Sequence, residues 1–177
     1  MSKGLQRSLG RGPVTKQDVQ NLHYAISGSL DITGVAATVD AGTFVIGGLP
    51  QGNILLLGAV SYVAVDAGTD AEVIDNWAGD YGIGSIPNAD VDLADAGDDN
   101  FIPSTALLAG GADKLSPRAR ATSTVGTEQG VILDNTDGSL ELNFNLLIDD
   151  NVIDDAGVGT FLVTGDLFLA LVVLGDD

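Results

Sequence analysis

Residues 139–149, SLELNFNLLID, indicate the kind of structure that the chain forms, because apolar and polar side chains alternate along them. Leucine or phenylalanine stands at positions 140, 142, 144 and 146, and glutamate or asparagine stands at the three positions between. Successive side chains of a strand point to opposite faces. The stretch therefore predicts a strand with one face in the core and the other in water.

Similar signals recur from Leu30 to the C-terminus. Runs rich in Val, Ile, Leu, Thr and Phe alternate with clusters of Gly, Asp and Asn, at intervals typical of an antiparallel sandwich or barrel. We expect roughly eight to ten strands, the longest at Asn53–Val65, Ser139–Asp149 and Thr160–Leu174. Residues 168–174 are apolar on both faces, which predicts a central strand or one covered by a neighbouring subunit.

Acidic turn sequences separate these runs. Asp-Ala-Gly occurs at 40–42, 66–68, 95–97 and 155–157. Glycine adopts positive φ and aspartate accepts bonds from backbone N–H groups, so each copy predicts a tight reversal between strands. Asp137-Gly138 likewise predicts a hairpin between residues 131–133 and 140–142.

The N-terminal residues differ from the rest. Residues 1–28 are expected to form a basic arm, because the first sixteen are polar and contain Gly4, Gly10, Gly12 and Pro13. Such a segment is expected to be flexible and to order on contact with a partner. Val19, Leu22 and Ile26 have helical spacing, compatible with a short helix within residues 17–26. Residues 29–177 are then the β-sandwich domain.

Length and composition limit the classes of protein. A chain of 177 residues fits one self-sufficient domain plus a tail, and the absence of cysteine excludes disulfides and thiolate chemistry. We expect no secretory signal, since no apolar run follows the basic N-terminus, and no membrane span in the interrupted apolar run at residues 161–174. Positive mean hydropathy in so acidic a chain predicts a subunit interface.

The charge distribution suggests a binding partner. The formal net charge is -18, and all seven cationic side chains lie in two short stretches. They are Lys3, Arg7, Arg11 and Lys16 near the N-terminus, and Lys114, Arg118 and Arg120 near the middle. The remaining acidic body has no internal cation to pair with, so its carboxylates are solvated, bound in turns or neutralised by a partner. We interpret the seven cations as the partner-binding residues; the net charge opposes nucleic-acid binding.

The sequence contains no catalytic constellation and predicts no cofactor. His23 is the single histidine, and no cysteine can join it in a metal or nucleophile site. Residues 134–138 lack the ligand spacing of an EF-hand, and the acidic pairs at 98–99, 149–150 and 154–155 are interpreted as solvated in preference to a Ca²⁺ site. Trp77 and Tyr81 allow either a sugar-binding platform or core packing. An enzyme is therefore the least favoured class.

A resemblance adds a specific function. The strings WAGDYGIGSIPNAD at 77–90, FIPSTALL at 101–108 and GDLFLALVVLGD at 165–176 resemble the head decoration, or cement, proteins of tailed bacteriophages. The resemblance implies a jelly-roll-like β-fold, a homotrimer, and a place on the outside of the head, where the protein braces the major capsid protein. The alternative is a carbohydrate-binding or host-adhesion module that uses Trp77, Tyr81 and the acidic loops.

The unpaired acidic charge generates a first prediction. Added salt should raise the melting temperature, because screening weakens repulsion among carboxylates that have no cation nearby. A salt series followed by circular dichroism measures this effect. A melting temperature that falls with salt would show that attractive charge pairs outweigh the repulsion.

Overall fold

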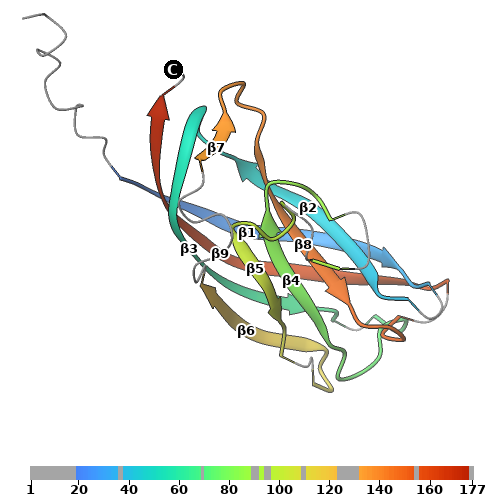
Figure 1. Cartoon of the computed structure of the whole chain (residues 1–177). Coiled ribbons are helices and arrows are strands. Elements are labelled where there is room, and N and C mark those ends of the chain that lie inside the picture. The colour runs from blue at the N-terminus through green and yellow to red at the C-terminus, as the bar shows by residue number, and fades with distance from the viewer. Residues whose placement is uncertain are drawn as a thin grey trace, which may run out of the picture.

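The computed structural model describes residues 19–35, 38–68, 70–88, 92–93, 97–108, 111–122, 132–153 and 156–175. In these ranges the chain forms nine strands, arranged in two layers (Figure 1). The strands are β1 (Gln20–Thr33), β2 (Asp40–Gly48), β3 (Gly52–Asp66), β4 (Gly79–Gly84), β5 (Ile102–Ala106), β6 (Leu115–Thr122), β7 (Ile132–Asn135), β8 (Glu141–Ile148) and β9 (Val158–Gly175). This described part contains no helix long and apolar enough to cross a membrane.

The topology is that of a jelly roll. Four antiparallel pairings are nested along the chain: β4 with β5, β3 with β6, β2 with β8, and β1 with β9. This ribbon is wrapped into two sheets, one in the order β1-β9-β3-β6 with β7 also on β3, and one in the order β2-β8-β4-β5. The predicted all-β, jelly-roll-like sandwich is confirmed.

The three longest predicted strands are confirmed as β3, β8 and β9. β9 lies between β1 and β3, so the sequence that is apolar on both faces belongs to a central strand, as expected. Its inward side chains, such as Phe161 and Leu167, are fully buried against the second sheet. A strand paired along both edges has most of its backbone N–H and C=O groups hydrogen-bonded within the sheet.

Aromatic side chains fill the space between the sheets. Tyr81 stacks on Phe144 at 5.7 Å between ring centroids, and Phe144 stacks on Phe44 at 5.2 Å. Trp77 meets the ring of Phe161 edge-on at 5.3 Å. The buried Tyr81 hydroxyl is 2.9 Å from the hydroxyl of Ser61 on the facing sheet. This hydrogen bond satisfies two buried polar groups and links the layers.

The N-terminal helix prediction was wrong. Residues 20–33 are strand β1, so the sandwich begins at Gln20 and not at residue 29. Leu22 and Ile26 lie on the inward face of that strand with Leu30 and Ile32, which is a period of two. Long-range pairing with β9 decides the conformation, because a short amphipathic segment has little helical stability of its own.

The expectation of a wet face on β8 was also wrong. Asn143 and Asn145 are both buried, and described residues of the connection between β4 and β5 bond to Asn145. The Asn145 amide donates to the carbonyl oxygens of Asp98 at 2.6 Å and Ile86 at 3.1 Å, and its oxygen accepts the N–H of Asn88 at 2.9 Å. The side chain of Asn145 therefore holds the connection between β4 and β5 against strand β8 through three hydrogen bonds.

Of three predicted turns, at residues 137–138, 40–42 and 66–68, the first two differ from the prediction and the third agrees with it. Asp137-Gly138 does reverse the chain, and Gly138 has a φ of 72° and donates to the carbonyl of Asn135 at 3.0 Å. It connects β7 to β8 in different sheets, so it forms no hairpin. The Asp-Ala-Gly copy at 40–42 begins β2, whereas the copy at 66–68 is the predicted reversal, in which Asp66 accepts the N–H of Gly68 at 2.7 Å.

The role of Asn145 can be tested by truncation. Asn145→Ala should lower the free energy of unfolding by about 3 kcal/mol, because it leaves buried carbonyl and N–H groups without partners. Asn143→Ala is the matched control on the same face, since its described side-chain bond, to the carbonyl of Glu141, is 3.5 Å long; its expected cost is below about 1.5 kcal/mol. Urea denaturation measures both, and equal losses would contradict the pinning role.

Candidate interaction surface

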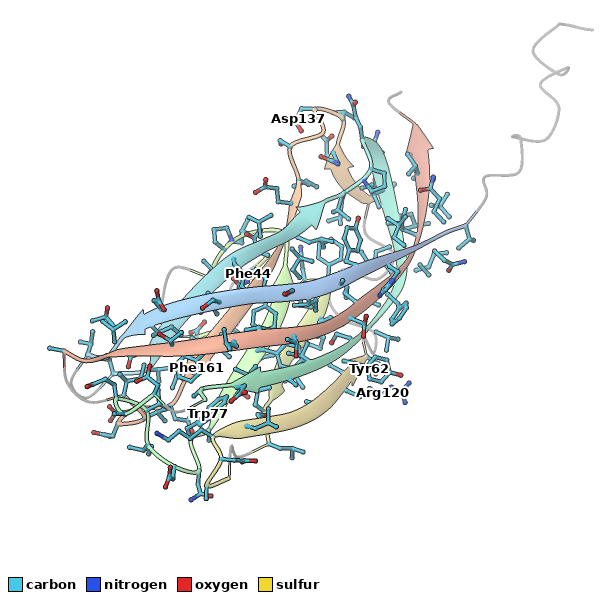
Figure 2. All side chains as sticks on the ribbon, turned by 180° about the vertical axis from the view of Figure 1, so that it is seen from behind. Phe44, Tyr62, Trp77, Arg120, Asp137 and Phe161 are labelled. Carbon is cyan, nitrogen blue, oxygen red and sulfur yellow. The ribbon has the colours of Figure 1, made fainter. Side chains whose placement is uncertain are left out.

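The outward face of the β1-β9-β3-β6 sheet, here called the outer face, carries several exposed large apolar side chains. Leu57 and Phe168 are each 45% exposed and Leu162 is 51% exposed. Soluble proteins rarely expose large apolar side chains together without a partner to cover them. Figure 2 views the molecule from this side, with Tyr62 and Arg120 adjacent on it.

A groove of about 540 Å³ crosses the outer face near the start of β1. Its lining comes from four strands: Asn21, Leu22 and His23 of β1, Leu57–Val60 of β3, Phe168–Ala170 of β9, and Thr122 of β6. A register shift between Leu56 and Gly58 bends β3 at this place. A Cβ atom on Gly58 would meet nothing within 4 Å, so the missing side chain leaves the groove open.

One wall of the groove is an aromatic pair. His23 lies opposite Phe168 in the register of β1 and β9, and their rings stack with centroids 4.7 Å apart and planes 10° apart. The Nε2 atom of His23 is 2.9 Å from Oδ1 of Asp166. The carboxylate therefore fixes the orientation of the imidazole and holds it flat against the half-exposed Phe168.

The next row across the sheet carries a cation. Arg120 lies opposite Tyr62 in the β3–β6 pairing, and its guanidinium is 5.9 Å from the centroid of the Tyr62 ring. Arg120 is exposed, and a guanidinium over an aromatic ring keeps its charge available to a carboxylate of a partner. The outer face therefore combines apolar surface with a positive group in an otherwise acidic chain.

The structure separates the predicted partner-binding cations. Lys3, Arg7, Arg11 and Lys16 lie outside the described residues, and so does the side chain of Arg118. Residues 115–122 form strand β6, which pairs with β3. Of the expected contact residues, Arg120 lies on the outer face, while Lys114 lies before β6 at its other end.

Lys114 has a structural role. Its backbone is in the left-handed region with a φ of 57°, and its carbonyl accepts the indole N–H of Trp77 at 2.8 Å and the backbone N–H of Ala67 at 3.1 Å. Its ammonium donates to the backbone carbonyl of Asp70. These bonds tie three loop segments together, so the charge of Lys114 is partly committed within the chain.

The aromatic pair of the carbohydrate hypothesis is not on the surface. Trp77 and Tyr81 are both fully buried, and their polar atoms are bonded to Lys114 and Ser61. This corrects the alternative reading of the two residues, because a sugar-binding platform needs an exposed ring face. Trp77 is a core residue under a loop.

Acidic side chains line a shallow depression beside β4. Asp80, Asp92 and Asp149 line a pocket of about 330 Å³ together with Leu93 and Leu147. Desolvation by burial, and then repulsion from Asp149, raise the pKa of the Asp80 carboxyl above its usual range. Among the described residues no three His, Asp or Glu side chains are placed to hold a metal ion, and residues 154–155 lie outside them.

Comparisons with known proteins found no matching family model and no matching curated protein. Solved viral structures are distantly similar. The infectious bursal disease virus VP2 subviral particle matches 90% of this chain at 11% identity with a TM-score of 0.35, and the virus's Gx strain matches 92% at 12% identity with a TM-score of 0.36. The chain of Desmodium yellow mottle tymovirus matches 94% of the present chain at 8% identity with a TM-score of 0.30. The match covers 95% of that viral chain. The present chain spans 33% and 37% of the two bursal disease virus chains.

Sequence reasoning missed the importance of His23, Leu57 and Phe168. The apolar character of residues 168–174 predicted a central strand or one covered by a neighbouring subunit. Nothing local marked His23 as the partner of a ring on the last strand. The two are brought together by the β1–β9 register. A period-two reading of residues 20–33 would have placed His23 on the outward face of a strand.

The raised pKa of Asp80 predicts a pH-dependent effect. A carboxyl whose pKa is higher in the folded state than in the unfolded state stabilises the fold below the unfolded value, and this contribution is lost as the pH rises through the folded value. Asp80→Asn should therefore raise the melting temperature at pH 7, with little gain at pH 3. Thermal unfolding at both pH values measures the difference, and a gain of equal size at pH 3 would contradict it.

Proposed function

We propose that this protein is a structural protein of a virion, a decoration protein that binds the outside of a capsid and stabilises the lattice of the major capsid protein. The outer face carries the proposal. It presents half-exposed apolar side chains around a groove, and the guanidinium of Arg120 lies in the next row across the sheet. The resemblance of residues 77–90, 101–108 and 165–176 to phage cement proteins supports the same role.

The outer face has the composition of a protein interface. Aromatic rings and arginine dominate the energetics of such surfaces, whereas aspartate and lysine contribute little at their centres. Phe168 supplies a half-exposed ring, and Arg120 supplies a charge that its stacking on Tyr62 holds in place. We infer that Phe168 and Leu57 insert into an apolar site on the capsid and that Arg120 meets a carboxylate there.

The N-terminal cations are proposed to add a second attachment. Lys3, Arg7, Arg11 and Lys16 are linked through residues 17–19 to β1, whose first residues line the groove. Two attachments on one chain raise the effective concentration of each, so together they bind more tightly than either alone. The acidic remainder of the surface would then face solvent.

The proposed function predicts which substitutions weaken attachment. Phe168→Ser and Arg120→Glu should each reduce affinity for capsids about tenfold or more, since each removes a central contact. Arg120→Lys should reduce it less, because the charge remains. The measurement is rebinding of purified protein to capsids from which it has been stripped.

Ile74→Ser is the control for this series. Ile74 is 46% exposed, close to the value for Phe168, but it lies in the loop beside Trp77 and not on the outer face. It should bind as the unmodified protein does. Equal binding by Phe168→Ser and Ile74→Ser, both folded by circular dichroism, would contradict attachment through the outer face.

A further inference from the structure

Strand β1 is a long regular strand at the border of its sheet. It pairs with β9 from Gln20 to Thr33 without a register shift. Among the residues that the structure describes, β9 is the one strand paired with it, and Figure 2 shows β1 at the border of the sheet beside β9. A border strand carries a row of N–H and C=O groups that can pair with another strand.

The other border strands carry features that oppose such pairing. β7 has four residues, and β5 has five residues and includes Pro103. β6 includes Pro117, and its pairing with β3 shifts register between Val63 and Val65. The pairing of β2 with β8 shifts register between Val45 and Gly47. Proline removes a donor, and bulges twist a border strand away from a partner. β1 has neither, so it is the border strand best suited to pairing.

The charge of β1 favours a second copy of the same chain. Two molecules of net charge -18 repel each other over most of their surfaces. β1 carries a single carboxylate, that of Asp31, and no Lys or Arg. Its outward side chains are all exposed, and those at its middle, Ala25, Ser27 and Ser29, are small and uncharged. Two copies can approach closely here.

We propose that β1 pairs antiparallel with β1 of a second copy, about a two-fold axis at Ser27, so that two five-stranded sheets become one continuous sheet. A two-fold axis places each residue before Ser27 opposite the residue equally far after it. His23 of each copy then lies opposite Asp31 of the other, so an imidazole lies across from a carboxylate at two places in the pairing. Ala25 lies opposite Ser29.

The inward side chains fit the same register. Leu22 and Tyr24 are half-buried in one chain and lie opposite the second copy's Ile32 and Leu30. The pairing therefore sets apolar side chains opposite each other on the inward face at both sides of the axis. A slip of one residue would exchange inward and outward side chains, and the buried face opposes such a slip. This pairing closes with two copies, unlike the trimer that the family resemblance implies.

Disulfide trapping tests the register, because the chain has no cysteine of its own. Ser27→Cys places two thiols across the axis, where opposed Cα atoms are about 4.5–5.5 Å apart, within the reach of a disulfide. Mild oxidation should give a linked dimer of two 18.0 kDa chains. Thr164→Cys is the control, since Thr164 is the exposed neighbour of Ser27 on β9, one strand from the axis.

Light scattering supplies the second measurement. The unmodified protein at micromolar concentration should have the mass of two chains, and Ser27→Glu should give monomers, because it sets two carboxylates against each other. Ser104→Glu, on border strand β5, should leave the dimer intact. A monomer or trimer mass for the unmodified protein, or equal crosslinking by Ser27→Cys and Thr164→Cys, would overturn the proposal.

Discussion

Strand β9 is paired along both of its edges, with β1 on one side and with β3 on the other, and this double pairing organises the molecule. It joins the outermost pairing, β1 with β9, to the inner pairing of β3 with β6. The first and last strands of the chain therefore lie side by side. One face of β9 buries Phe161 and Leu167 in the core. The other face brings His23, Phe168 and Tyr62 into one outward surface, which the proposed function uses.

The acidic composition then determines what that surface can bind. Several carboxylates are committed to the chain's own backbone: Asp66 accepts the N–H of Gly68, and hydrogen bonds from Thr136 and Ser139 lower the pKa values of Asp134 and Asp137. Lys114 is committed as well, through its bond to the carbonyl of Asp70. Arg120 is the described cation that remains on the outer face, so a partner with apolar surface and a carboxylate fits it best.

Local patterns predicted the strands but not how they meet. Residues 53–65, 139–149 and 160–174 were recognisable because apolar side chains mark strands wherever they lie. The short helix that the spacing allowed within residues 17–26 does not form from Gln20 onward, because pairing with β9 overrides the helical spacing of Leu22 and Ile26. The wet face of β8 was wrong because a covering loop is not visible in that strand's own sequence. Likewise, His23 and Asp166 are separated by 143 residues, so no local signal joins them.

The central claim is that this protein sits on the outside of a capsid, held by its outer face. An image of the native particle by electron cryo-microscopy tests it most directly. The account predicts density of this jelly roll outside the capsid shell, with Phe168 and Arg120 directed at the major capsid protein. Particles without such density, or density with the outer face turned to solvent, would contradict it.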